Sequence, residues 1–175
     1  MKLTMLFSAL LAGMLTMTSA LAADNVHFSG ALVAEPCTLP DADTNIQVDF
    51  GTVIVKYLYQ YQRTKSEPFT IHLEDCDPSV MKTVSVTFEG TADDELTSML
   101  ALDPVSTAKG IAIGLAKADG TSLKLNEAGS YEALSVGNNS LKFNAYVMAK
   151  PTAIATNNVV AGSFQALSLF VLNYA

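Results

Sequence analysis

The amino-acid sequence predicts an all-β protein, and three observations lead to this fold class. Apolar residues repeat with a period of two, which is typical of strands rather than of amphipathic helices. The alternating runs are short and stop at residues that form turns. No long helical pattern, internal repeat or linker interrupts the series. Several short strands at this spacing predict a single-domain β-sandwich.

Five alternating runs predict strands in chain order, each with one apolar face and a clear boundary. The runs are Ile46-Val48-Phe50 before Gly51, Phe69-Ile71-Leu73 before Cys76, Val84-Val86-Phe88 before Gly90, Ile111-Ile113-Leu115 before Asp119-Gly120, and Leu141-Phe143-Ala145-Val147 before Lys150-Pro151. Residues 96–102 fit a short helical turn. Asp75 to Pro78, Asp103-Pro104 and Asn138-Asn139 supply further turn signals.

The first 22 residues have the layout of a secretory signal peptide. Met1-Lys2 gives a positive start, residues 3–21 carry no charge, and Ala20-Leu21-Ala22 forms a small-x-small cleavage site. The alternative is a membrane anchor, because the apolar run is just long enough to cross a bilayer. Its Ala, Ser, Thr and Gly content and the following Asp24 favour the signal peptide. We predict cleavage after Ala22, with Ala23 as the alternative.

The remaining chain is long enough for one domain with its own core. The whole sequence is acidic, with a formal net charge of −7. Nucleic-acid surfaces need Lys and Arg to neutralise phosphate, and anionic lipid attracts basic segments. The charge therefore argues against nucleic-acid and anionic-lipid binding. No second apolar stretch could cross a membrane, so we expect no membrane insertion.

Two cysteines, Cys37 and Cys76, lie in the exported part of the chain. An even number of cysteines in an oxidising compartment predicts one disulfide bond. Two free buried thiols are the alternative.

Ala23 to Leu32 form a strand-like stretch before Cys37. One face of this stretch carries Val26, Phe28, Gly30 and Leu32, and the other carries His27, Ser29 and Ala31. An N-terminal segment frays unless something holds it. Two interpretations stay open: a first strand that folds onto its own core, or an exposed tail whose apolar face needs a groove elsewhere.

Ser163 to Ala175 form the most apolar strand pattern in the chain. One face carries Phe164, Ala166, Ser168, Phe170, Leu172 and Tyr174, and the other carries Leu167, Leu169 and Val171. Such a strand is an association hazard if it lies at a sheet edge. It is either a central strand covered by others or an edge that receives a partner strand.

Several motifs resemble one family in their order and spacing. They are Val26-His27-Phe28-Ser29-Gly30 with Glu35-Pro36-Cys37, Ser66 to Cys76, Phe88-Glu89-Gly90, Gly110 to Ile113, Ala145 to Ala149, and Val159 to Gly162 with Tyr174-Ala175. Together they resemble the chaperone–usher pilins of Gram-negative bacteria, and most closely the minor or adaptor subunits of P-type or type 1-like fimbriae. The resemblance spans essentially all of the predicted mature chain.

The resemblance implies an incomplete immunoglobulin-like β-sandwich that lacks its last strand. A donor strand completes it, lent first by a periplasmic chaperone and then, at an outer-membrane usher, by the N-terminal extension of the next subunit. The implied organisation is a signal peptide at 1–22, a donor-strand extension at 23–34 and a pilin domain at 35–175. The implied product is a fimbrium on the cell surface, exported through the periplasm.

The same resemblance assigns roles to residues. Cys37 and Cys76 form the family's disulfide. The donor strand presents Val26, Phe28, Gly30 and Leu32. The groove and the chaperone or subunit contact involve Gly162, Phe164, Ala166, Phe170, Leu172, Tyr174 and Ala175. The extension before Cys37 is shorter than in many major pilins, which fits a minor or adaptor subunit, and the chain has no room for a receptor-binding domain.

No residue pattern predicts an enzyme, a cofactor or a metal site. His27 and His72 are the only histidines, and CxxC, HExxH and G-x-S-x-G motifs are absent from the sequence. Asp93-Asp94-Glu95 lacks the spacing of an EF-hand loop and fits a solvated loop.

The alternative function is a secreted carbohydrate-binding β-sandwich. Tyr57, Tyr59 and Tyr61 form an alternating row that could stack on sugar rings, although the chain has no Trp. We expect these tyrosines to line a strand face or a subunit contact instead.

Overall fold

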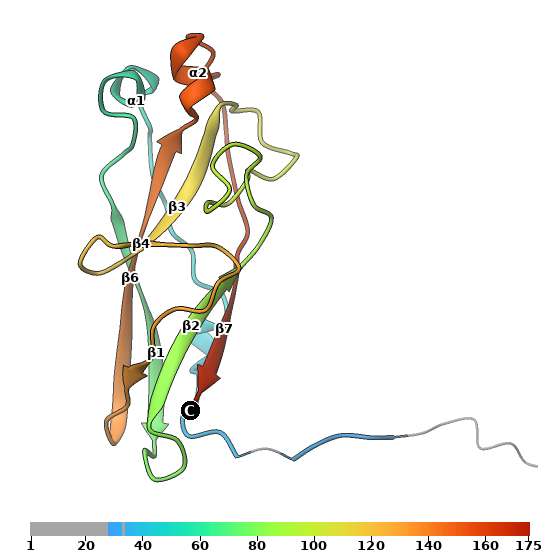
Figure 1. The fold of residues 1–175 in the computed structure, drawn as a ribbon, viewed down its shortest axis with the longest axis vertical. Helices are drawn as coiled ribbons and strands as arrows, with labels where there is room; N and C mark the ends of the chain where they lie inside the picture. Colours follow the sequence, from blue (N-terminus) through green and yellow to red (C-terminus); the bar gives the residue numbers. More distant parts are fainter. Residues whose placement is uncertain (1–27, 33) are drawn as a thin grey trace, which may run out of the picture. The chain divides into compact units, whose positions relative to one another are not determined.

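The structure is a computed structural model that describes residues 28–32 and 34–175. It divides the chain into two units, residues 1–33 and residues 34–175. The second unit is a two-layer β-sandwich, as the alternating pattern predicts (Figure 1). The predicted signal peptide and Val26 lie outside the described residues.

One layer is a four-stranded antiparallel sheet with the order β1-β6-β3-β4. Its strands are β1 (Glu67–Cys76), β3 (Ile111–Lys117), β4 (Ser122–Leu123) and β6 (Gly137–Ala149). The long strand β6 pairs with β1 along one side and with β3 along the other. Its inward residues Leu141, Phe143, Ala145 and Val147 are buried, which confirms the predicted period of two.

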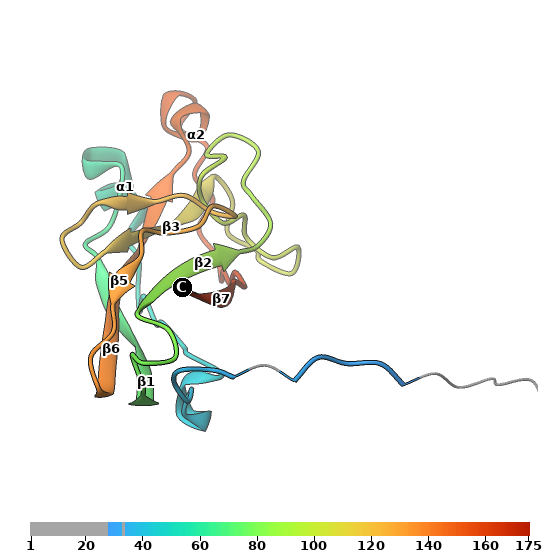
Figure 2. The same ribbon diagram turned by 60° about the horizontal axis from the view of Figure 1, so that its bottom comes forward.

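The other layer has three strands in the order β5-β2-β7. They are β2 (Thr83–Glu89), β5 (Glu132–Ala133) and β7 (Leu169–Tyr174). Strand β7 pairs antiparallel with β2 from Val84↔Tyr174 to Glu89↔Leu169. The view in Figure 2 shows β2 and β7 as a layer apart from β1 and β6.

The core between the layers is built from aliphatic and aromatic side chains. Phe88 and Phe143 make an edge-to-face contact with ring centroids 5.0 Å apart, and Phe69 packs against both rings. Ile71, Leu73 and Val147 are fully buried. This aromatic cluster joins β1 and β6 to β2, because its rings come from both sheets.

Four of the five predicted strands are present, and the prediction for residues 46–50 is wrong in a specific way. Ile46, Val48 and Phe50 do face the core, but this segment pairs with no strand among the described residues. The predicted C-terminal strand is also shorter than expected, because only Leu169–Tyr174 joins a ladder. Before it, Ser163 and Gln165 bond to residues 103–108, and the Ser168 hydroxyl donates to the Glu89 carbonyl at the end of β2.

Two expectations about helices are wrong: a helix holds the tyrosine row, and residues 96–102 contain none. Helix α1 (Val55–Tyr61) contains the whole tyrosine row, so the row does not lie along a strand face. The helical spacing instead packs Tyr57 against Tyr61, with ring centroids 4.4 Å apart and the rings tilted by 40°. A second helix, α2 (Pro151–Ala155), and a 3₁₀ turn, η1 (Asp41–Asp43), complete the elements. Residues 96–102 form turns rather than a helix.

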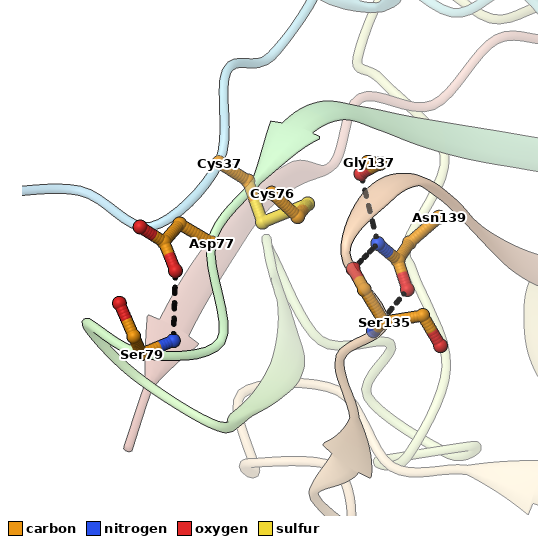
Figure 3. Close-up of a disulfide and its surroundings, with 7 residues drawn as sticks. All are labelled: Cys37, Cys76, Asp77, Ser79, Ser135, Gly137 and Asn139. Carbon is orange, nitrogen blue, oxygen red and sulfur yellow. Dashed lines mark hydrogen bonds between the residues drawn. A yellow bond between two sulfur atoms is a disulfide. The ribbon is translucent and has the colours of Figure 1, made fainter.

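The predicted disulfide between Cys37 and Cys76 is present (Figure 3). Cys37 lies at the start of the sandwich and Cys76 ends β1, where it pairs with Gly137 at the start of β6. Beside the bond, the Asn139 side chain closes a turn by accepting the Ser135 N–H and donating to the Ser135 carbonyl. The disulfide therefore anchors the beginning of the domain to the same end of the sandwich as this turn.

Among residues 28–32 and 34–175, no helix is long and apolar enough to cross a membrane.

Candidate functional site

The outer edge of β7 is the most unusual feature of the sandwich. Within the described part of the chain, β7 pairs with β2 on one side and with no strand on the other. An unpaired edge presents a row of N–H and C=O groups that can pair with another chain. The side chains of Phe170, Leu172 and Tyr174 are only half-buried although they pack against the core.

The hydrogen-bond phase of the β2–β7 pair shows which main-chain groups face this edge. Thr83 and Ala175 exchange two hydrogen bonds, at 2.9 and 3.0 Å. In an antiparallel pair such doubly bonded positions alternate with positions whose N–H and C=O point away. Phe170, Leu172 and Tyr174 occupy the second kind of position. Their main-chain groups therefore face outward while their side chains face the core.

A second apolar row lies opposite this edge. It consists of Ile46, Val48, Phe50 and Val53, all half-buried against the core. Phe50 and Val53 are three residues apart rather than two, so the strict alternation is broken between them. Gly51, with a φ of +56°, lies at this break, and the side chains of Phe50 and Val53 both face the core. Residues 45–53 make no main-chain to main-chain hydrogen bond with any described residue. The segment is therefore held by side-chain packing alone.

The two rows approach each other at Phe50 and Phe164, whose ring centroids are 6.1 Å apart. We call the two rows together the open edge. Its residues are Ile46, Val48, Phe50 and Val53 on one side and Phe164, Ala166, Phe170, Leu172 and Tyr174 on the other. The open edge combines half-buried apolar side chains with unpaired main-chain groups, which are the two requirements for binding an extended strand.

Gly162 supports the open edge from behind. A Cβ at this position would lie 2.6 Å from the Ala108 nitrogen, so only glycine allows residues 160–165 to lie this close to residues 103–109. The Asp103 N–H donates to the Gln165 carbonyl, and the Thr107 N–H donates to the Ser163 carbonyl. Gly162 therefore positions Phe164, although its own contacts are with the supporting loop.

The end of β7 is fixed near the start of the domain. The Ala175 carbonyl oxygen accepts the N–H groups of Lys82 and Thr83, both at 2.9 Å. Partial burial, with a smaller contribution from the negative charge of Glu35, raises the pKa of the Tyr174 hydroxyl above its usual value. Glu35 stands two residues before Cys37, so the chain enters the domain close to the end of the open edge.

The described part of the predicted donor strand presents its side chains to solvent. Phe28 is 95% exposed and Leu32 is fully exposed. A Cβ at Gly30 would meet no atom within 4 Å. These observations describe residues 28–32 by themselves.

The remaining polar clusters have structural partners. The buried Asp43 carboxylate accepts the main-chain N–H of His72 and contacts its ring nitrogen at 2.9 Å. Lys150 pairs with Asp93 at 2.6 Å and with Asp94 at 2.5 Å, and this hydrogen bond and charge lower the pKa of the Asp94 carboxyl. No described group of three or more His, Cys, Asp or Glu side chains could hold a metal ion.

The tyrosine row offers no exposed platform of three rings. Tyr57 and Tyr61 pack against each other, and the Tyr59 hydroxyl accepts the Val159 N–H at 3.0 Å. Two of the rings are thus occupied by each other and the third is tied to the loop after α2. Strand docking at the open edge is the function that the arrangement supports best.

Comparison with known proteins agrees with this geometry. The family model described as "Fimbrial protein" matches residues 26–175. The chain belongs to this family. Its members are structural subunits of fimbriae and not enzymes. The chain is therefore a structural pilin subunit of a chaperone–usher fimbria, a surface fibre in which such subunits polymerise with their neighbours.

Relatives are found among both minor and major fimbrial subunits. The chain is 39% identical to the fimbrial-like protein YfcP of Escherichia coli K12 over 90% of this chain and 88% of that protein. It is 34% identical to the fimbrial adapter PapK of Escherichia coli over 97% and 95%. It is also 34% identical to the major MR/P fimbria protein of Proteus mirabilis over 89% of each chain.

Solved structures confirm the fold class. The P pilus rod subunit PapA superposes with a TM-score of 0.70 at 23% identity, over 81% of this chain and all of that chain. A subunit from the structure of a chaperone–usher pilus gives a TM-score of 0.69 over 90% and 99%. These pilins have an immunoglobulin-like sandwich, and this fimbrial subunit shares it.

Sequence reasoning identified one side of the open edge and missed the other. The C-terminal row was predicted from its alternation and its place at the end of the chain. Ile46, Val48 and Phe50 were interpreted as an ordinary paired strand. The only available signal was Gly51, which interrupts the alternation, and it does not distinguish a paired strand from an unpaired one.

Proposed function

We propose that this subunit assembles by donor-strand exchange at the open edge. The N-terminal segment of a neighbouring subunit lies beside β7 and pairs with the outward main-chain groups of Phe170, Leu172 and Tyr174. Its alternate side chains cover the apolar surface between β7 and residues 46–53. The observation that carries this proposal is the coincidence of unpaired main-chain groups and half-buried apolar side chains on the same residues of β7.

The N-terminal segment of this subunit serves the next neighbour in the same way. Val26, Phe28, Gly30 and Leu32 form its donor face. The segment from Val26 to Leu32 has about the length of the six-residue strand β7. Burial of Val, Phe and Leu side chains contributes about 1.5–3 kcal/mol each before the costs of ordering the strand. Gly30 fits where a side chain would meet the receiving surface.

Before assembly, the open edge needs a temporary partner. We propose that a periplasmic chaperone supplies a strand at the same place and contacts the C-terminal Ala175, and that an outer-membrane usher exchanges it for a subunit strand. These steps require export of the subunit to the periplasm. The N-terminal 22 residues supply the signal, residues 23–34 the extension and residues 35–175 the pilin domain.

The first test combines the subunit with the chaperone of its own gene cluster. Wild-type chain and a variant lacking residues 26–30 are produced in the periplasm and purified. We expect both to co-purify with the chaperone in a one-to-one complex. Only the wild type should form a complex with a further subunit, because only it has the complete donor segment. A stable monomer that ignores the chaperone would show that the sandwich is complete and would refute the proposal.

Point variants separate the donor face from the rest of the extension. Phe28→Asp places a charge on the donor face, whereas Ser29→Asp places the same charge on the opposite face. We expect Phe28→Asp to block transfer to the next subunit and Ser29→Asp to permit it. Equal effects of the two variants would contradict an alternating donor face.

We also propose that the subunit has a minor or adaptor position in the fibre. The support is the short extension before Cys37, together with the likeness to the adapter PapK. Immunogold labelling of fimbriae decides the question. Label confined to the tip or to one junction fits the proposal, and label along the whole shaft refutes it.

A further inference from the structure

Exposed apolar side chains lie at both ends of the sandwich, apart from the open edge. Helices α1 and α2 lie at one end, and the end of β1 and the C-terminus lie at the other (Figure 1). Cys76 of the disulfide is the last residue of β1. At the helix end, Ile54 is 63%, Val105 72% and Val160 44% exposed. At the disulfide end, Val80 is 45% and Val136 is 85% exposed.

Hydrogen bonds place these residues at their respective ends. Ile54 caps α1, and Tyr59 of α1 bonds to Val159, next to Val160. Val105 lies in the turn from Asp103 to Ser106, which bonds to the chain that follows α2. Val80 closes a turn directly after Cys76, and Val136 precedes Gly137, the partner of Cys76.

The direction of the donor strand decides which ends meet. Strand β7 runs from the helix end to Ala175 at the disulfide end, and each subunit's own extension enters its domain near Cys37, also at the disulfide end. A donor strand parallel to β7 would bring the donor's domain to the recipient's disulfide end. The recipient's own extension leaves from that same end, so both neighbours would compete for it.

An antiparallel donor strand avoids this conflict. It brings the donor's domain to the recipient's helix end and leaves the disulfide end free for the next neighbour. Head-to-tail contacts of this kind can repeat from subunit to subunit without forming a closed ring, and such repetition produces a fibre. Polymerisation of the family's subunits therefore favours the antiparallel direction.

The tether between the donor strand and the donor's domain is short. Only five peptide units separate Leu32 from the disulfide-bonded Cys37, and five extended residues span at most about 17 Å. The disulfide end of the donor must therefore lie directly against the helix end of the recipient. Exposed apolar groups on the two touching surfaces are then buried together.

We infer that Ile54, Val105 and Val160 form a docking surface for the disulfide end of the neighbouring fimbrial subunit that donates its strand. This inference rests on the donor-strand exchange proposed above. At the disulfide end of this subunit, Val80 and Val136 form the corresponding surface, which contacts the helix end of the neighbour that receives this subunit's own donor strand. The contact makes each junction between subunits stiffer than a bare strand tether.

Site-specific photo-crosslinking in assembled fimbriae tests the inference, whichever subunit of the fibre is the neighbour. A photo-reactive phenylalanine analogue replaces Val105, Leu172 or Leu167 in cells that express the complete fimbrial gene cluster. Leu172 reports on the open edge. Leu167 is the matched control, because it is 78% exposed but lies beside Gly90, directly after the end of β2.

The three positions distinguish the two proposals. We expect Val105 to crosslink to a neighbour's segment around its second cysteine, Leu172 to crosslink to a neighbour's N-terminal extension, and Leu167 to give much less of either product. A Leu172 product without a Val105 product overturns the docking surface and leaves strand exchange intact. Absence of the Leu172 product refutes strand exchange itself.

A charge variant gives a second readout that does not depend on the probe. Val105→Asp changes a residue outside the open edge, and we expect fimbriae that carry it to break at this subunit under shear more often than those with Leu167→Asp. Equal breakage in the two variants overturns the docking surface.

Discussion

The rings of Phe50 and Phe164 pack against each other with centroids 6.1 Å apart and an interplanar angle of 37°. Residues 45–53 have no main-chain bonds to the described strands, so this contact is a main link between the two sides of the open edge. The link depends on side-chain packing, which can adjust when a strand is inserted. The open edge is thus held in shape without being closed.

The first prediction concerns this aromatic pair. We expect Phe50→Ala and Phe164→Ala each to lower the free energy of unfolding by about 2 kcal/mol, less than for a fully buried Phe, because both rings are half-exposed. In the double variant we expect a coupling of about 0.5–1.5 kcal/mol. Urea denaturation of the subunit, with its open edge filled by a donor-strand peptide, measures both quantities. Val105→Ala is the control, and a coupling near zero would contradict the link.

The second prediction concerns the disulfide. Cys37 and Cys76 are 39 residues apart in sequence. In the chain-entropy model, removing a crosslink of this size lowers the free energy of unfolding by about 4 kcal/mol. We expect this loss in the Cys37→Ser/Cys76→Ser variant, measured by urea denaturation. A reducing agent should destabilise the wild type by a similar amount and leave the variant unchanged.

The third prediction concerns the outer face of the larger sheet. The Tyr146 ring lies over Gly114, its cross-strand partner, and the Arg63 guanidinium lies 3.6 Å from the ring centre. A Cβ on residue 114 would overlap the ring. We therefore expect Gly114→Ala to cost about 2 kcal/mol of unfolding free energy.

A second variant tests this reason for the glycine. In a Tyr146→Ala background the ring is gone, so Gly114→Ala should cost much less. Thermal unfolding of the four combinations gives the coupling. Gly30→Ala is a control with open space at its Cβ, and we expect no measurable effect on stability.

The fourth prediction concerns alkaline pH. The pKa of Tyr174 is raised by partial burial and then by the charge of Glu35, so the folded subunit holds the phenolic proton more tightly than the unfolded chain. The stability from Tyr174 is fully present below the ordinary pKa of about 10 and is lost as the pH rises through the raised value. Urea denaturation from pH 8 upward measures this loss.

Tyr174→Phe removes the ionisable group while keeping the ring. Its stability should fall less steeply above the ordinary tyrosine pKa than that of the wild type. Equal slopes would show that ionisation of Tyr174 does not contribute. Tyr61→Phe is the matched control, because Tyr61 is half-exposed on α1, away from the open edge.

Local patterns were sufficient for most of the fold. The alternation of Leu141, Phe143, Ala145 and Val147 predicted β6, since one face of a strand is buried whenever sheets stack. The tyrosine row was misinterpreted because a spacing of two residues also occurs within a helix. The seven residues of the helix, Val55–Tyr61, are too few for periodicity to separate the two structures.

Strand periodicity, the apolar C-terminal row and the presence of two cysteines follow from the amino-acid sequence alone. These properties depend on residues close together in the chain. The three-dimensional arrangement was needed to establish that residues 45–53 lie unpaired opposite β7, and that Phe170, Leu172 and Tyr174 direct their main-chain groups outward. Both features follow from which strands are neighbours in space, and that choice depends on packing across the whole sandwich rather than on any local pattern.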